Sequence, residues 1–196
     1  RYSADSKDAE LTAKNIKFMP SAVEFCAQFK GESADVRLAI PGKFSVYNAL
    51  NTIAIGLALG ISLADCAEAM SSAHGVKGRM EVVPTDGDYT VIIDYAHTPD
   101  ALENALKALK AVTNERVVVL FGCGGDRDRT KRPIMGGIAA DNADFVIVTS
   151  DNPRTEEPQA IVDEILCGLE GKSTPHIAIC DRVEAIKWAI DNHRPN

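Results

Sequence analysis

The fold is decided by Val117-Val118-Val119-Leu120-Phe121-Gly122-Cys123-Gly124-Gly125-Asp126, an apolar run that passes into a glycine-rich polar loop. Two more apolar runs end in polar loops, Val91-Ile92-Ile93 before Asp94-Tyr95-Ala96-His97, and Phe145-Val146-Ile147-Val148 before Thr149-Ser150-Asp151-Asn152-Pro153-Arg154. Short β-branched runs that alternate with helical stretches predict parallel strands. Because ligands of parallel sheets bind beyond the carboxyl ends of the strands, these loops mark a candidate binding site.

The composition of this 196-residue chain is that of a globular protein, since 45% of its residues are hydrophobic. The formal net charge of −7 argues against a nucleic-acid-binding or membrane-surface protein, which needs a basic surface. A local basic cluster of Arg127, Arg129, Lys131 and Arg132 lies beside the glycine loop. It favours an anionic group of a small molecule as its partner, although solvated side chains near a helix start give the same pattern.

The cysteines indicate a reducing compartment, because the five are scattered and form no Cys-x-x-Cys pair. No charged-then-apolar leader opens the chain, and no apolar run reaches membrane-spanning length. We therefore expect a cytoplasmic monomer without membrane contact. Both ends look cut, since the chain starts with Arg1 rather than Met and nothing follows its last helical stretch to complete another strand. We expect part of a larger protein.

The first part of the chain is predicted to form an antiparallel meander and two helices. Gly31 and the segment Ser33-Ala34-Asp35 supply turn residues for the meander. Gly60 is expected just after the first helix, and Ser62 or Asp65 is expected to cap the second. The expected strands lie near residues 15–18, 23–26 and 36–40, and the expected helices near 46–59 and 63–72.

The second part alternates regularly between strands and helices, and Pro99 and Pro158 lie where a first-turn proline belongs. This alternation predicts an α/β fold, a Rossmann-like, doubly wound and mostly parallel sheet, preceded by the antiparallel strands and helices. The change of pattern predicts two domains, residues 1–78 and 79–196. The expected strands lie near residues 80–84, 90–94, 116–121, 144–149 and 176–180, and the expected helices near 99–111, 133–141, 158–170 and 182–191.

The glycine loop alone leaves its chemistry open. Glycines let backbone N–H groups approach an anion closely, and a helix that starts after the loop adds a favourable partial charge. The loop is not a P-loop, because no Gly-Lys-Ser/Thr ends it, and it lacks the third glycine of a dinucleotide fingerprint. A tight turn between strand and helix explains the glycines equally well.

The loop after Ile93 suits a nucleotide. Asp94, at a strand end, can accept both hydroxyls of a ribose, and His97 can donate to a phosphate or hold the loop through a backbone bond. The alternative is that Asp94 caps the following helix, although Thr98 is better placed for that role.

The loop at residues 151–154 suits an amino acid. Arg154 offers a planar fork for a carboxylate, and Asp151 can accept from an ammonium group. Together they would bind an amino-acid zwitterion. The alternative is a type I turn with Pro153 at its second position.

Taken together, these stretches resemble the Mur ligase family, and within it the branch that adds meso-diaminopimelate to UDP-N-acetylmuramoyl-L-Ala-D-Glu. The resemblance covers nearly the whole chain. The matching stretches are residues 42–49, 78–81, 94–100, 121–128 with 131–133, and 151–158.

The resemblance implies that four residues bind ATP. Asn48 matches the asparagine that contacts the adenine, and Arg79 matches the arginine that approaches the phosphates. Asp94 matches the aspartate that binds the ribose, and His97 matches a histidine near the nucleotide.

The resemblance also implies an amino-acid site made of Arg127 and the segment Asp151, Asn152, Pro153 and Arg154. Arg154 matches the family's mark for meso-diaminopimelate. This is physically sensible, because meso-diaminopimelate has a second carboxylate that lysine lacks and an arginine can pair with it bidentately.

The implied reaction is ATP-dependent amide bond formation. ATP would phosphorylate the glutamyl γ-carboxylate and leave as ADP, and the amine of meso-diaminopimelate would attack that acyl phosphate and release phosphate. The cofactors are ATP and Mg²⁺, with the Gly-Lys-Thr loop, the carbamylated lysine and the metal ligands expected upstream of this chain. The partners are small-molecule substrates only. We expect no catalytic residue here, and a chain that is inactive alone.

The chain departs from the family at two places. Ser45 stands where an asparagine is usual, on the adenine side. The Gly-Lys-Gly-His-Glu segment that helps to bind diaminopimelate is expected beyond the end of this chain.

Three alternatives stay open. A folylpolyglutamate-type ligase shares the architecture and an Asp-x-Ala-His loop, although the Asp-Asn-Pro-Arg segment argues against it. A nucleotide-binding oxidoreductase domain would need an acidic ribose-binding residue about 20 residues beyond the glycine loop, where Asp141 and Asp144 lie. A non-catalytic amino-acid-binding module would bind diaminopimelate without any dependence on ATP.

Overall fold

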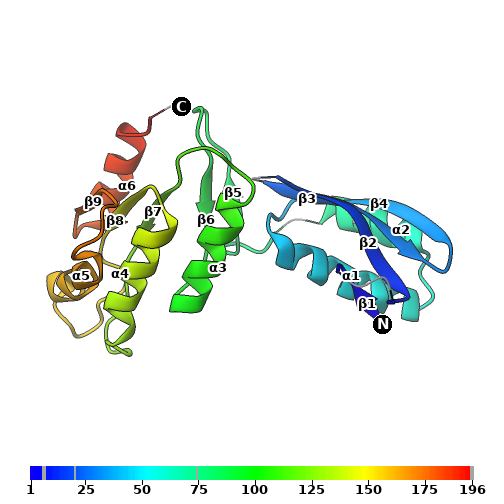
Figure 1. Cartoon of the computed structure of the whole chain (residues 1–196), viewed down its shortest axis with the longest axis horizontal. Helices are drawn as coiled ribbons and strands as arrows, with labels where there is room; N and C mark the ends of the chain where they lie inside the picture. The colour runs from blue at the N-terminus through cyan, green and yellow to red at the C-terminus, as the bar shows by residue number, and fades with distance from the viewer. Residues whose placement is uncertain (6–7, 20, 74, 195–196) are drawn as a thin grey trace. The chain divides into compact units, whose positions relative to one another are not determined.

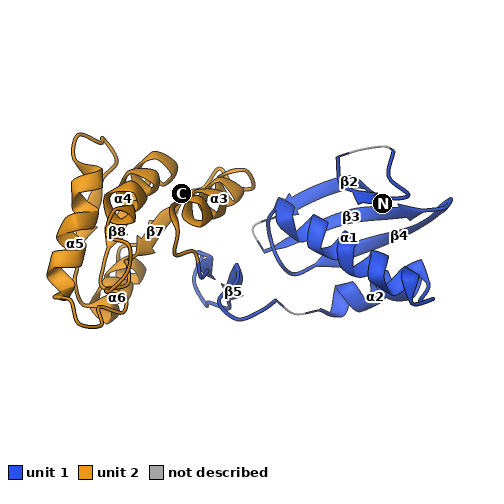
Figure 2. Cartoon of the chain, turned by 90° about the horizontal axis from the view of Figure 1, so that it is seen from below, with its two compact units in different colours: residues 1–95 blue, residues 96–196 orange. Residues whose placement is uncertain are grey.

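The structure, a computed structural model, describes residues 1–5, 8–19, 21–73 and 75–194. It divides into two compact units, residues 1–95 and 96–196 (Figure 2). The domain boundary predicted from the sequence, between residues 78 and 79, lies inside the first of these units. That boundary therefore stays a prediction. Each unit has its own sheet and its own core.

The first unit contains the predicted antiparallel meander. Lys30 and Gly31 form the turn between β3 (Ala22–Phe29) and β4 (Glu32–Leu38), and both have positive φ, 48° and 88°. This two-residue turn suffices, so Ser33-Ala34-Asp35, expected as turn residues, instead belong to β4 and pair with β3. The strands, in sheet order, are β1 (Tyr2–Ser3), β2 (Leu11–Met19), β3 (Ala22–Phe29) and β4 (Glu32–Leu38).

Two helices pack on this sheet, α1 (Lys43–Ala58) and α2 (Leu63–Ser72). Gly60 follows the C-cap of α1 with φ 85°, and the Ser62 hydroxyl caps α2 by accepting from the Asp65 N–H, as predicted. The core of the unit joins Val23 and Phe25 of the sheet to Leu50 of α1.

A hairpin of β5 (Glu81–Val83) and β6 (Val91–Ile93) completes the first unit. The two strands pair antiparallel, Glu81 opposite Ile93, in a sheet of their own. The expectation that residues 91–93 form a parallel strand is therefore wrong. A three-residue apolar run predicts a strand but not its partner, and the nearest partner in the chain is β5.

The second unit is a three-stranded parallel sheet in the order β7-β8-β9, covered by helices on both faces (Figure 1). The predicted parallel α/β arrangement is confirmed for this unit, while a reversal of strand order, which a doubly wound sheet has, is not among its three described strands. Helix α4 starts two residues earlier than expected. The elements are α3 (Pro99–Lys110), β7 (Val118–Phe121), α4 (Lys131–Asn142), β8 (Phe145–Val148), α5 (Pro158–Leu166), the 3₁₀ turn η1 (Cys167–Leu169), β9 (His176–Ala178) and α6 (Arg182–Asp191).

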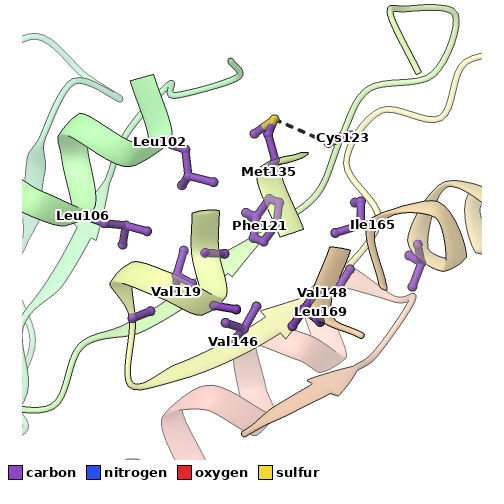
Figure 3. Packing of buried hydrophobic residues seen from close by; sticks show 14 of the residues in the cluster. Leu102, Leu106, Val119, Phe121, Cys123, Met135, Val146, Val148, Ile165 and Leu169 are labelled. Carbon is purple, nitrogen blue, oxygen red and sulfur yellow. Dashed lines mark hydrogen bonds between the residues drawn. The ribbon is translucent and has the colours of Figure 1, made fainter. Parts of the chain in front are cut away.

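The faces of β8 show how the unit is layered. Val146 and Val148 are fully buried and pack in one core with Met135 of α4 and Ile165 of α5 (Figure 3). Phe145 points to the opposite face, because successive strand residues alternate, and its ring stacks on Trp188 of α6 with centroids 5.5 Å apart. This rigid sandwich fixes the strand ends from which the candidate site is built.

Candidate functional site

The site starts where β7 and β8 end side by side. The parallel register places Phe121 opposite Val148, so the loops that follow leave from the same edge of the sheet. The Thr149 N–H donates to the Phe121 carbonyl at 3.0 Å, and Thr149 itself is fully buried. The predicted meeting of these two loops is thus present.

The glycines of the first loop serve its contact with the second loop. A Cβ on Gly122 would lie 2.2 Å from the Thr149 carbonyl oxygen, and a Cβ on Gly125 would lie 1.9 Å from that of Pro153. Real Cβ atoms do not approach backbone so closely, so neither position accepts a side chain while the loops stay together. The structure thus gives Gly122 and Gly125 a role in backbone-to-backbone packing of the two loops, and the approach of an anion to this loop stays a prediction.

Hydrogen bonds lock the two loops together. The Gly125 N–H donates to the Asn152 carbonyl at 2.9 Å, and Arg154 Nη1 donates to the Gly125 carbonyl at 2.5 Å. The Asp126 carboxylate accepts from the Thr155 hydroxyl at 2.7 Å and from its N–H at 3.3 Å. The loops therefore behave as one preorganised surface.

Arg154 is the exposed centre of this surface. Its φ of 52° lies in the left-handed region, which rules out the alternative of a type I turn with Pro153 and Arg154 at its two central positions. A guanidinium has five N–H donors. In the described part of the chain, the Gly125 carbonyl is the only hydrogen-bond acceptor of this side chain, so four donors remain for a ligand.

The neighbouring predicted residues lie on the same loops. Asp151 and Asn152 are exposed, and Pro153 is half-buried between the loops. Arg127 is exposed at the end of the glycine loop, where its Nη1 donates to the Asp126 carbonyl at 3.2 Å. The structure thus gathers all five predicted amino-acid-binding residues on the two interlocked loops.

Two of the four residues of the basic cluster form internal ion pairs. Arg132 is fully buried, and its guanidinium binds Glu156 at 2.7 Å and Glu164 at 2.8 Å. Arg129 also pairs with Glu164, and Lys131 donates to the His97 carbonyl at 2.7 Å. Internal ion pairs therefore account for the two arginines, Arg129 and Arg132. Arg127 and Lys131 keep their charges outside ion pairs among the described residues.

Glu156 links this buried arginine to the glycine loop. Its Oε1 accepts from Arg132 Nη2 and from the Asp126 N–H at 2.6 Å. The hydrogen bonds from Arg132, followed by that backbone bond, lower the pKa of Glu156 to about 2. Sequence reasoning missed this role. The available signals were the basic cluster at residues 127–132 and the acidic pair Glu156-Glu157, but a sequence does not show that two distant segments lie close together in space.

The predicted nucleotide-binding residues are spread over several elements. Arg79 and Asp94 lie at one end of the β5–β6 hairpin, where Asp94 accepts from the Met80 N–H at 2.9 Å and the Arg79 guanidinium lies 4.4 Å from the centre of the Tyr95 ring. Asn48 is exposed on α1. His97 precedes α3, with its side chain exposed.

Two further predictions concern the cap of α3 and the serine that stands where the family usually has an asparagine. Thr98, not Asp94, caps α3, since its hydroxyl accepts from the Ala101 N–H. The Ser45 hydroxyl is buried and donates to the Pro41 carbonyl at 2.8 Å, so it holds the start of α1. Hence the serine contributes its hydroxyl to the fold rather than to an exposed contact.

The acidic residues beyond the glycine loop are also committed. Asp141 binds Lys172 at 2.8 Å, and Asp144 accepts from the Val117 N–H at 2.8 Å and pairs with Lys110. Neither carboxylate is available as the ribose acceptor of a dinucleotide site, which removes the support for the oxidoreductase alternative.

Other features of the described residues are negative. They contain no group of three or more His, Cys, Asp or Glu side chains that could hold a metal ion. Within the same ranges, no helix is long and apolar enough to cross a lipid bilayer. The five cysteines are free thiols, and burial raises the pKa of Cys123, whose Sγ lies 3.8 Å from Met135 Sδ.

Comparisons with known proteins show which family this chain is similar to. Residues 78–196 match the family described as "Mur ligase, glutamate ligase domain". The chain is 47% identical over 184 residues to the UDP-N-acetylmuramoyl-L-alanyl-D-glutamate–2,6-diaminopimelate ligase of Caldanaerobacter subterraneus, covering 94% of this chain and 38% of that protein. It is 46% identical over 189 residues to the Bacillus cereus ligase of the same name, covering 96% and 38%.

A solved structure of a UDP-N-acetylmuramoyl-L-alanyl-D-glutamate–2,6-diaminopimelate ligase superposes with a TM-score of 0.73 at 35% identity, covering 98% of this chain and 39% of that one. A folylpolyglutamate synthase from Thermotoga maritima has the same TM-score at 23% identity, covering 92% and 42%, and so shares the fold. The chain therefore spans about two fifths of the length of these relatives.

The parallel sheet, with its connected loops at the strand ends, defines an α/β domain. With the match over residues 78–196, the chain belongs to the Mur ligase family.

Proposed function

We propose that this chain supplies the amino-acid site and part of the ATP site of a ligase that joins meso-diaminopimelate to UDP-N-acetylmuramoyl-L-Ala-D-Glu. The proposal is supported by family membership and by relatives that carry the name of this ligase at 43–47% identity. We also propose that the complete protein is a cytoplasmic monomer whose partners are these small molecules.

The observation that carries the proposal is the state of Arg154. Its guanidinium is exposed, anchored by a single hydrogen bond to the Gly125 carbonyl, with four N–H donors left over in the described structure. A planar fork of this kind suits a bidentate carboxylate. The second carboxylate distinguishes meso-diaminopimelate from lysine, so Arg154 is the residue that selects between them.

The other residues of the two loops complete the amino-acid site. Asp151 accepts from an ammonium group, Arg127 attracts a carboxylate, and Asn152 offers an amide. Pro153 supports the turn that presents them, with its carbonyl bound by the Glu156 N–H at 3.0 Å. These groups bind and orient the amine, which lowers the entropic barrier to its attack.

For ATP, Arg79 supplies a cation for a phosphate and Asp94 a carboxylate for the ribose, and both lie at one end of the same hairpin. This pair of groups fits the nucleotide. We assign Asn48 to the adenine and His97 to the neighbourhood of the phosphates. We assign Mg²⁺ to residues outside this chain. No catalytic residue is assigned here.

The test is steady-state ADP release by the full-length ligase that carries this sequence. The assay compares meso-diaminopimelate with L-lysine, and wild type with Arg154→Ala and Arg154→Lys. We expect ADP release that depends on diaminopimelate, and a KM for it that rises about 10- to 100-fold in Arg154→Ala, as for the loss of a charge-assisted hydrogen-bond pair. Arg154→Lys should rescue only part of this, because lysine lacks the fork.

Two results would contradict the proposal. Equal use of lysine by wild type removes the specificity assigned to Arg154. No ADP release with either amino acid, together with tight binding of diaminopimelate without ATP, favours the amino-acid-binding module.

A further inference from the structure

Gly124 faces the guanidinium of Arg154. A Cβ built on Gly124 would lie 2.9 Å from Arg154 Nη1 and 3.7 Å from the Asn152 carbonyl oxygen. The backbone of Gly124 does not adopt a positive φ, so its conformation is open to any residue. What keeps a side chain out of this position is the arginine head group.

Gly124 differs in this respect from the other glycines of the loop. Side chains on Gly122 and Gly125 would strike backbone atoms of the facing loop at 2.2 and 1.9 Å, and those atoms cannot yield without separating the loops. The atom that faces Gly124 ends a flexible exposed side chain, which can move. The missing side chain of Gly124 therefore leaves space for the Arg154 side chain, whereas those of Gly122 and Gly125 leave space for the facing backbone.

We infer that Gly124 is a specificity-determining position, because its missing side chain lets the Arg154 guanidinium seat against the Gly125 carbonyl. This inference rests on the proposed function of Arg154. An alanine at residue 124 would push Nη1 outward and break its 2.5 Å hydrogen bond. The guanidinium would then lose its hydrogen bond to the Gly125 carbonyl and its orientation toward the carboxylate of the ligand. Charge-assisted hydrogen bonds are short and directional, so this change of orientation weakens binding.

The test is a double-mutant cycle in the full-length ligase, with Gly124→Ala, Arg154→Ala and the double variant. Gly137→Ala, on α4, is the matched control, since its Cβ would have only an ordinary contact at 3.5 Å. We expect Gly124→Ala to raise the KM for meso-diaminopimelate about tenfold and to leave the KM for ATP and the melting temperature near wild type. The double variant should match Arg154→Ala, because the glycine acts through the arginine.

Each other outcome is decisive. A wild-type KM for diaminopimelate in Gly124→Ala, effects that multiply in the double variant, or a folding defect in Gly124→Ala each overturn the inference while the proposed function stands. If Arg154→Ala leaves that KM unchanged, the function proposed for Arg154 fails and the inference fails with it.

Discussion

Arg132 is a charged residue without exposed surface, and its partners explain how the fold accommodates it. Glu156 and Glu164, with side chains only 20% and 29% exposed, satisfy its two terminal nitrogens, while its Nε has no hydrogen-bond partner in the described structure. The loss of either glutamate would leave a buried charge partly uncompensated, which lowers the stability of the fold. Since Glu156 also binds the Asp126 N–H, the group ties the core to the candidate site.

This arrangement predicts a pH dependence of stability. Arg132 lowers the pKa of Glu156 to about 2 in the folded chain, from an ordinary value of 4.5. A lowered folded-state pKa stabilises the fold above the unfolded pKa, and this contribution is lost as the pH falls from about 4.5 towards 2. Glu156→Gln should therefore lower stability at pH 7 and flatten its dependence on pH in that window.

Urea unfolding of the chain at several pH values measures this effect. The matched control is Glu157→Gln, which removes the adjacent exposed charge that no ion pair holds among the described residues. An unchanged pH profile in Glu156→Gln, or an equal effect of both variants, would show that the carboxylate does not stabilise the fold in this way.

At the same scale, the sequence predicts residue types better than residue partners. Arg154 and Asp151 were identified from their chemistry, and their loops do meet. The burial of Arg132 was missed because its partners lie 24 and 32 positions away, and a basic cluster gives the same pattern whether it is solvated or paired.

Among the elements, the contact of α4 with α5 and η1 depends on glycine. A Cβ on Gly168 would lie 1.8 Å from the Pro133 carbonyl oxygen, and one on Gly136 would lie 2.3 Å from that of Ile165. The helices thus approach backbone to backbone, which brings Met135 into the core with Leu169.

Gly168→Ala is therefore expected to destabilise the chain by about 1–3 kcal/mol, as over-packing does when backbone must shift. Gly137→Ala, whose Cβ would lie at an ordinary 3.5 Å from the Gly168 carbonyl oxygen, should be neutral or stabilising by up to about 1 kcal/mol, because alanine is the better helix former. Urea denaturation of both variants checks the pair. Similar free energies of unfolding would mean that the helices can separate at little cost.

The sequence predicted helices and strands correctly wherever the hydrophobic periodicity agreed with the residues that start or end an element. Ser62, Thr98 and Pro158 mark helix starts in the structure as predicted. Strand partners did not follow: residues 91–93 read as a parallel strand but pair with β5, because three residues carry no information about the neighbouring strand.

For the whole molecule, the predicted domain boundary at residues 78/79 and the division into units at 95/96 differ by the β5–β6 hairpin. A change of pattern reports where strands begin to alternate with helices. It does not report which body a short hairpin packs with, since that depends on contacts distant in sequence.

The isolated chain is expected to release no ADP from ATP, even with the full set of substrates. Its described residues lack a metal-binding cluster. The segment Gly171-Lys172-Ser173 has the residue types of a phosphate loop, but it lies between η1 and β9 rather than after a strand, and Lys172 is paired with Asp141. Positioning residues without a phosphate-binding loop hold substrates but do not activate them.

An ADP-release assay on the isolated chain, with the full-length ligase as positive control, measures this directly. Steady turnover by the purified chain, at a rate that rises with its concentration, would contradict the proposal that this chain only positions substrates. The residues that bind and activate the phosphates would then lie within this chain.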